Sequence, residues 1–258
     1  MFKVSRRFLR VWQRDFTVYR KSWKVSFVPP LLEPLFYLTA FGVGLSGLVG
    51  NLRYQGVEVS YVQFIAPALI GMSIMYNSFF ETTYTSFVRM YYQKTFDAMM
   101  ATPLSLDEVI TGEIVWGATR SLIAAAIMLG VISLFGLIRF PHGLLVLPLA
   151  FVGGMAFASI GICFTAIVPN IDMFNLPVFL FITPMFLFSG TFFPLENLPG
   201  WAQDLALLFP LTHLTNLSRS LCFGEFHSRM LWETGYLLVF NLIFFPLGLV
   251  KMNKRLIK

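Results

Sequence analysis

Long apolar stretches with few charges constrain this chain more than any other feature. The hydrocarbon core of a bilayer needs about 20 consecutive apolar residues per helix. Six stretches meet or nearly meet that length: residues 25–49, 61–80, 121–138, 143–168, 173–195 and 231–250. Charged residues make up only 12% of the chain, about half their share in soluble domains. We therefore predict an all-α integral membrane protein with six transmembrane helices, and we exclude a soluble enzyme and a disordered chain.

Basic residues are concentrated at the two ends of the chain. Residues 1–24 hold eight Lys or Arg residues, and the tail after Val250 holds four. The predicted loops at 50–60 and 139–142 hold one each. The positive-inside rule therefore places both termini in the cytoplasm. The same bias explains most of the net charge of +6, so the charge does not call for a nucleic-acid partner.

Residues 1–24 are predicted to form an amphipathic interface helix, and residues 25–258 a single transmembrane domain. Aromatic side chains recur every three or four residues on one helical face: Phe8, Trp12, Phe16, Tyr19 and Trp23. Basic side chains occupy the opposite face. This arrangement is typical of a helix in the lipid headgroup layer. The helix either anchors the chain only, or also contacts a cytoplasmic partner.

Residues 81–118 form the longest predicted cytoplasmic connection. Pro103 interrupts its helical pattern, and Ser105 with Glu108 has the spacing of a capping box. We predict a short helix near 95–101, a break, and a second helix that starts directly after the cap and runs into the third span.

Apolar side chains in this connection are expected to be exposed. Phe96, Met99 and Met100 lie among charged residues. They either contact a partner protein or dip into the bilayer.

Residues 196–228 precede the last span and are predicted to lie outside the cell. Their two apolar runs, 201–209 and 211–221, are each too short to cross a bilayer. Such runs fit a re-entrant helical hairpin that closes the outer end of a pathway, or a loop lying on the surface. The residues that we assign to this external gate are Pro199, Trp201, Pro210 and His213.

Ionisable residues are rare within the predicted spans. Glu33 is a candidate for a functional intramembrane charge because buried acids in spans are costly. Alternatively it has a structural partner, such as Arg120 near the inner interface or the basic N-terminal helix.

Aromatic residues are abundant in the first and fifth spans. Some could line a transport pathway or a dimer interface, or they could face lipid and pack in the core. The candidates are Tyr37, Phe41, Phe181, Phe186 and Phe188.

Sequence motifs for an energy source or for a metal site are absent. The chain has no G-x-x-x-x-G-K-[ST] phosphate loop and no H-E-x-x-H pair. Its two cysteines and three histidines are scattered. We therefore predict that the chain itself binds no cofactor or metal, and that transport would be passive or driven by another subunit.

Three segments resemble the ABC-2 family of ATP-binding-cassette exporter permeases. They are EPLFY with FGVGL in the first span, KTFDAMMATPLSLDEVITGEIVW at 94–116, and FLFSGTFFPLENLPGWAQDLALLFPLTHLTNLSRSL at 186–221. The third is fairly specific, and the first is weak by itself. Residues 81–116 look most similar to the branch of nodulation-factor (lipo-chitooligosaccharide) permeases, which shades into polysaccharide and drug exporters.

The resemblance implies a bacterial inner-membrane protein that works as a homodimer or as a pair of related permeases. Two copies of a separate cytoplasmic ATPase would bind ATP and Mg. A coupling helix near 94–102 would transmit their movement, and two short re-entrant helices would precede the last span. The residues assigned to ATPase coupling are Arg89, Lys94, Phe96, Asp97, Met99, Met100 and Pro103.

The resulting functional hypothesis is a permease subunit that exports an amphiphile through the bilayer. The amphiphile would be a lipid-linked or lipo-oligosaccharide, or a polysaccharide. Two alternatives stay open: a drug or lipid exporter of the same family, and a membrane scaffold or sensor without transport.

Overall fold

The computed structural model describes residues 4–45, 50–54 and 57–257. Within these residues six helices are long and apolar enough to cross a membrane, as predicted. They cover Phe8–Gly42, Tyr61–Tyr92, Leu106–Leu134, His142–Thr165, Ile171–Phe188 and Arg229–Leu256. The protein is therefore an all-α membrane protein in its main architecture.

Several spans contain π-helical or 3₁₀ turns. Helix α1 (Phe8–Thr39) continues into η1 (Ala40–Leu45), and α3 (Tyr61–Phe80) continues through η2 (Glu81–Thr85) and η3 (Val88–Tyr92). The fifth span consists of η5 (Ile171–Phe174), α7 (Asn175–Pro177), η6 (Val178–Ile182) and α8 (Thr183–Phe188). It ends seven residues before the predicted boundary at 195.

The other helices are regular. They are α4 (Thr95–Met100), α5 (Leu106–Leu134), α6 (Val146–Thr165) after η4 (His142–Leu145), α9 (Gly200–Leu207) after η7 (Leu195–Asn197), α10 (Pro210–Phe223) and α11 (Arg229–Leu256). A β-hairpin of β1 (Asn51–Tyr54) and β2 (Val57–Ser60) lies in the loop after the first span, where no strand was predicted.

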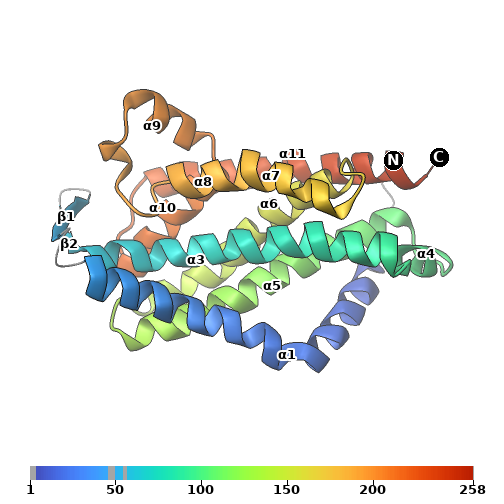
Figure 1. Cartoon of the computed structure of the whole chain (residues 1–258), viewed down its shortest axis with the longest axis horizontal. Helices are drawn as coiled ribbons and strands as arrows, with labels where there is room; N and C mark the ends of the chain where they lie inside the picture. The colour runs from blue at the N-terminus through green and yellow to red at the C-terminus, as the bar shows by residue number, and fades with distance from the viewer. Residues whose placement is uncertain (1–3, 46–49, 55–56, 258) are drawn as a thin grey trace.

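The elements form an elongated bundle with two distinct ends (Figure 1). The β-hairpin and α9 lie at one end, and α4 lies at the other with both chain termini. Helix α1 runs unbroken across the predicted boundary between interface helix and first span, and it is sharply bent (Figure 1). Pro29 and Pro30 explain this bend, because proline removes a hydrogen bond to the preceding helical turn and bends the helix there.

Small residues let the central helices approach closely. Helix α5 packs against α1, α3 and α6. A Cβ atom on Gly154 of α6 would lie 2.0 Å from Ser121 Oγ of α5, and one on Gly161 would lie 2.2 Å from Thr82 Oγ1. Close backbone contact of this kind stabilises helix pairs in lipid, where the hydrophobic effect between helices is weak.

Candidate functional site

Helix α4 forms a compact cap at one end of the bundle. Lys94 precedes it with φ 52° and ψ 28°, a left-handed conformation that reverses the chain. Ser105 and Glu108 form the predicted capping box, and α5 begins directly after the cap. The sequence-based helix, break and second helix in this connection are therefore confirmed.

The expected exposure of the apolar side chains of α4 is wrong. Phe96 and Met99 are buried in a cluster with Phe87 and Leu106, and Met100 is half-buried against the same cluster. Amphipathic burial of its apolar face fixes this short helix to α5. The surface that α4 leaves for a partner is polar.

Tyr91 and Tyr92, which precede α4, are 52% and 59% exposed. The exposed residues of α4 and its flanking turns include Lys94, Asp97, Ala98 and the turn that contains Pro103. We call this set the α4 face. It carries charges of both signs, and it presents them on a helix whose opposite side is held by the core. Such a face can dock another protein and pass its movement to α3 and α5.

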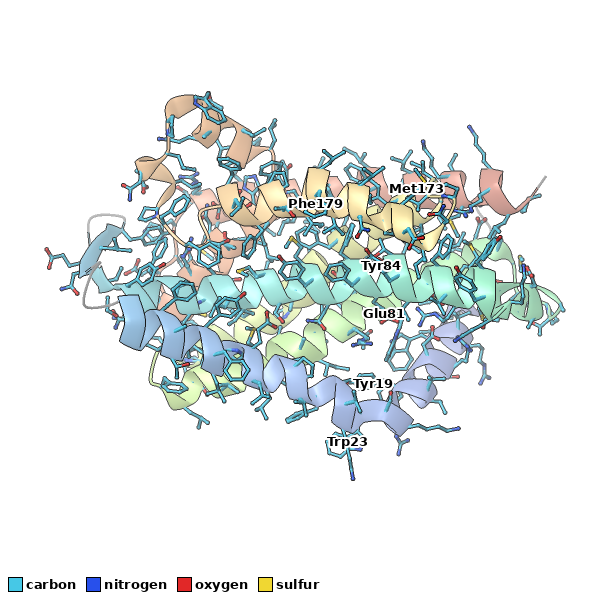
Figure 2. All side chains as sticks on the ribbon, viewed as in Figure 1. Tyr19, Trp23, Glu81, Tyr84, Met173 and Phe179 are labelled. Carbon is cyan, nitrogen blue, oxygen red and sulfur yellow. The ribbon has the colours of Figure 1, made fainter. Side chains whose placement is uncertain are left out.

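Arg89 does not lie on the α4 face, because it occupies a buried ion network. Its guanidinium lies 2.8 Å from Glu81 Oε1 and donates from Nε to Glu113 Oε2 at 3.1 Å. Arg120 donates to Glu81 Oε2 at 3.0 Å, and Trp116 donates to Glu81 Oε1 at 2.9 Å. Pairing of this kind is required for charges that are removed from water. The network joins α5 to the π-helical turns between α3 and α4; Figure 2 labels Glu81, its member at the end of α3.

Arg120 therefore has a different partner from the one suggested by the sequence. It pairs with Glu81, and its guanidinium also lies 5.5 Å from the ring centroid of Tyr19. Glu33 is half-buried on α1, and within the described part of the chain it has no ion pair. Its functional role stays a prediction.

The aromatic face of the N-terminal helix packs on protein. Trp12, Phe16 and Tyr19 surround Trp116 of α5 with ring-centroid distances of 6.5, 6.4 and 5.6 Å. Trp12 Nε1 also donates to Thr119 Oγ1 at 2.9 Å. This segment thus connects mechanically to the helix that follows α4.

One sequence signal could have revealed this packing. Asp15 lies next to Phe16 on the aromatic face, where a helix resting in lipid headgroups would avoid a buried acid. In the structure Asp15 is buried, and Arg14 donates to it at 2.7 Å.

Half-buried aromatic rings form a continuous row along α3. Successive ring centroids lie 5.0–6.2 Å apart in the order Tyr37, Phe41, Phe192, Phe186, Tyr76, Phe80, Tyr84. A final contact of 5.1 Å joins Tyr84 to Phe174. The row begins on α1 and η1 and ends at Tyr84 and Phe174; Figure 2 shows Tyr84 in the half of the bundle nearer α4. We call it the aromatic row.

The structure brings only some of the predicted pathway residues into this row. Tyr37, Phe41 and Phe186 belong to it. Phe181 instead contacts Phe164, and Phe188 contacts Trp201 of α9. Tyr76 and Phe80 of α3 and Tyr84 of η2 were not among the predicted pathway residues. Their spacing of four residues at 76, 80 and 84 was the available signal.

The predicted gate residues lie in and around two short helices. Pro199 precedes α9, and Trp201 on α9 is 66% exposed. Pro210 begins α10, where His213 is buried against Tyr236, with 4.1 Å between ring centroids. Its Nε2 atom lies 2.9 Å from the carbonyl oxygen of Leu207, and burial lowers the pKa of His213.

The comparisons with known proteins agree with this architecture. The sequence model of the ABC-2 type transporter family matches residues 6–223. The chain belongs to the ABC-2 type transporter family. The matched region contains the α4 face, the buried ion network, the aromatic row and both short helices.

Relatives extend the similarity over nearly the whole chain. "Nodulation protein J" of Rhizobium leguminosarum bv. viciae is 34% identical over 97% of this chain and 95% of its own length. The protein of that name from R. leguminosarum bv. trifolii is 35% identical over 98% and 95%. "Inner membrane transport permease YadH" of Escherichia coli K12 is 25% identical over 91% and 90%. The chain is therefore a multi-pass permease subunit of an ABC exporter.

Proposed function

We propose that this permease exports an amphiphilic lipo-oligosaccharide, driven by two copies of a separate cytoplasmic ATPase. The proposal that an ATPase drives this chain rests on the α4 face, a charged surface that Phe96 and Met99 fix to the core. An ATPase docked there would push on a helix that is firmly attached to the rest of the bundle. Because the chain has no phosphate loop, the energy would come from that partner.

The substrate class is supported by the aromatic row together with the relatives. The rings from Tyr37 to Tyr84 in this row are half-buried, so part of each stays accessible. Aromatic faces suit both acyl chains and the apolar faces of sugar rings. Relatives named for nodulation align over 97–98% of this chain, which favours a lipid-bearing oligosaccharide over a small drug.

Two copies of the chain are expected to enclose the path. Apolar side chains on α1 and the fifth span are widely exposed, including Phe36, Phe179 and Leu180. Such surface is covered by lipid or by a second permease. We place the protein in a bacterial inner membrane, with α4 and both termini on the cytoplasmic side. This orientation agrees with the basic residues at the two ends of the chain. The α9–α10 hairpin would then act as an external, re-entrant gate.

The coupling experiment reverses both charges of the α4 face. The double variant Lys94→Glu, Asp97→Lys is reconstituted with the ATPase in proteoliposomes, and uptake of a fluorescent N-acylated chitotetraose is measured with ATP hydrolysis. We expect basal hydrolysis to persist and ATP-driven transport to fall about tenfold, the effect of about 1.4 kcal/mol of lost docking energy.

The matched control is Glu58→Lys, which reverses an exposed acid on β2 at the opposite end. It should leave transport unchanged. Normal transport by the α4 double variant would exclude the α4 face as the coupling surface. Transport that does not depend on ATP, or no transport by the unaltered chain, would contradict the exporter proposal and favour a scaffold.

A further inference from the structure

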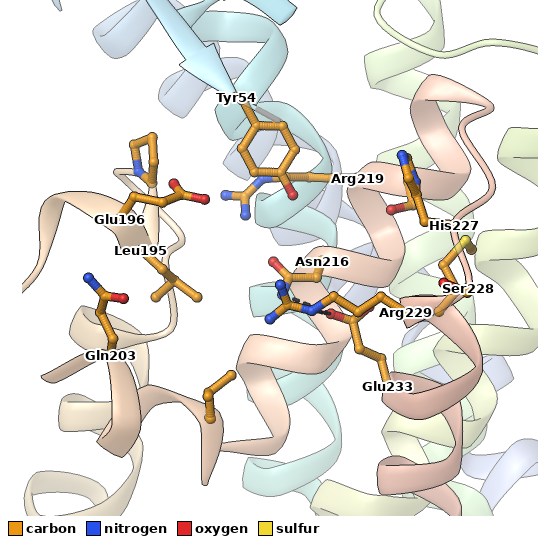
Figure 3. A pocket seen from close by; sticks show the side chains of 14 residues that line it. Tyr54, Leu195, Glu196, Gln203, Asn216, Arg219, His227, Ser228, Arg229 and Glu233 are labelled. Carbon is orange, nitrogen blue, oxygen red and sulfur yellow. Dashed lines mark hydrogen bonds and ion pairs between the residues drawn. The ribbon is translucent and has the colours of Figure 1, made fainter. Parts of the chain in front are cut away.

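A cavity of about 610 Å³ lies at the end of the bundle opposite α4. Its lining comes from β1, the segment 194–196, α9, α10 and the start of α11 (Figure 3). Side chains that border it include Tyr54, Glu196, Gln203, Asn216, Arg229 and Glu233. This volume lies within the range of about 300–1,000 Å³ that is usual for small-molecule sites. The cavity can therefore hold a ligand of the size of a small oligosaccharide unit.

The polar groups of the cavity favour a neutral ligand that both donates and accepts hydrogen bonds. The carboxylates of Glu196 and Glu233 balance the guanidinium groups of Arg219 and Arg229. The lining thus has no excess of formal charge that would select an anion or a cation. Sugar hydroxyls act as donors and acceptors at once, so they can use both kinds of group. An acyl chain could use neither.

The wall formed by α10 and α11 is already ordered by internal hydrogen bonds. Asn216 Nδ2 donates to Glu233 Oε1 at 3.0 Å, and Arg229 Nε lies 3.5 Å from the same oxygen. Because the amide nitrogen of Asn216 is directed to Glu233, its oxygen faces the open centre of the cavity (Figure 3). Groups held in this way lose little freedom when a ligand binds.

Arg219, also on α10, fixes the part of the lining next to β1. Its guanidinium donates to the carbonyl oxygens of Phe64 at 3.0 Å and Gly190 at 2.6 Å. The same guanidinium lies 5.6 Å from the ring centroid of Tyr54. Tyr54 also packs on Phe64 in an edge-to-face arrangement, with 5.3 Å between the ring centroids. One aromatic ring is thus fixed beside the polar groups, an arrangement that can take the apolar face of a sugar ring.

We propose that this cavity binds a neutral sugar unit of the exported molecule at the outer end of its path. The proposal rests on the proposed function for the identity of the ligand. The cavity is walled by the same α9–α10 hairpin that we assign to the external gate. A sugar bound there would bridge α9, α10 and α11, and it would hold the gate helices in a defined arrangement.

The test measures sugar binding to the permease alone, so that it does not depend on an ATPase. The full chain in phosphatidylcholine–phosphatidylglycerol nanodiscs is titrated with tetra-N-acetylchitotetraose, and binding is followed by saturation-transfer-difference NMR. Glu196→Gln and Asn216→Ala should each weaken binding about tenfold, because the first replaces one acceptor oxygen of the carboxylate with a donor amide and the second removes the amide oxygen. Asp204→Asn is the control, since this exposed acid of α9 lies outside the lining.

The outcomes separate this inference from the proposed function. Equal binding by Glu196→Gln, Asn216→Ala and the unaltered chain would place the sugar elsewhere and overturn the cavity site. Absence of sugar binding, or tighter binding of inositol hexaphosphate than of the sugar, would overturn a neutral glycan ligand. ATP-driven transport could persist in either case. Size-exclusion profiles and melting temperatures of all variants show whether the chain remains folded.

Discussion

At the scale of single residues, the charge pairing around Arg89 is the most demanding feature of the molecule. Glu113 is fully buried and accepts hydrogen bonds from both Arg89 and Ser86. Glu81 is shared by Arg89, Arg120 and Trp116. A buried carboxylate that loses its cation keeps the cost of its desolvation. The network therefore depends on each member.

The variant Arg89→Met tests this dependence. It leaves Glu81 and Glu113 without their shared cation, so we expect a loss of about 3–5 kcal/mol in the free energy of unfolding. Reversible unfolding in mixed micelles measures the change. The control Arg229→Gln removes an exposed cation 3.5 Å from Glu233, a buried carboxylate that keeps its hydrogen bond from Asn216, so a loss of only about 1 kcal/mol or less is expected. Equal stability of both variants would show that the buried network contributes little.

The residues of this network were only partly predictable. Local rules identified the Ser105–Glu108 cap because the capping box is a contact between near neighbours. Arg89 was assigned to ATPase coupling, and its pairing was not predicted because its partner Glu113 lies 24 positions away in the sequence. Pairing over that distance depends on how α5 folds back along α3, which periodicity does not specify.

At the scale of elements, the contact between α5 and α6 depends on residues without side chains. A Cβ atom at Gly154 would lie 2.9 Å from the Cα atom of Ala118, a backbone atom that cannot move aside. The two helices would have to separate to admit it. This contact positions the helix that leads from α4 into the membrane.

The variant Gly154→Ala is expected to destabilise the protein by about 1–3 kcal/mol through overpacking. Its matched control is Gly130→Ala on α5, where an added Cβ meets nothing within 4 Å of the described atoms. That change should be neutral or stabilise by about 0.5–1 kcal/mol, because alanine favours helix. Thermal unfolding of the two variants in detergent measures the contrast. A similar effect at both sites would refute close packing of α5 on α6.

Element boundaries show where sequence reasoning succeeds and where it stops. Apolar length predicted all six spans, and proline and serine positions predicted the break before α5. The continuation of α3 to Tyr92 was not predicted, because residues 81–92 are too polar to look like part of a span. Inside the bundle Arg89 pairs with Glu81 and Glu113, and Ser86 donates to Glu113. The β-hairpin after the first span also lacked a clear alternating pattern.

At the scale of the whole molecule, the two ends of the bundle differ in what they present. The α4 end presents a charged surface fixed to a buried core, and the opposite end holds a polar cavity under two short helices. The aromatic row runs along the bundle between them. This arrangement fits a protein that receives movement at one end and releases a ligand at the other. Such a protein requires an outside source of energy.

The most direct test of this account is native mass spectrometry of the permease purified gently from its own membranes. We expect a complex of two 29.3 kDa permease chains with two copies of a protein that carries a phosphate-binding loop. The variant Lys94→Glu, Asp97→Lys should release that partner while leaving the permease dimer intact. A permease that is always recovered without an ATPase, under conditions that preserve its dimer, would contradict the central claim that α4 couples this chain to ATP hydrolysis.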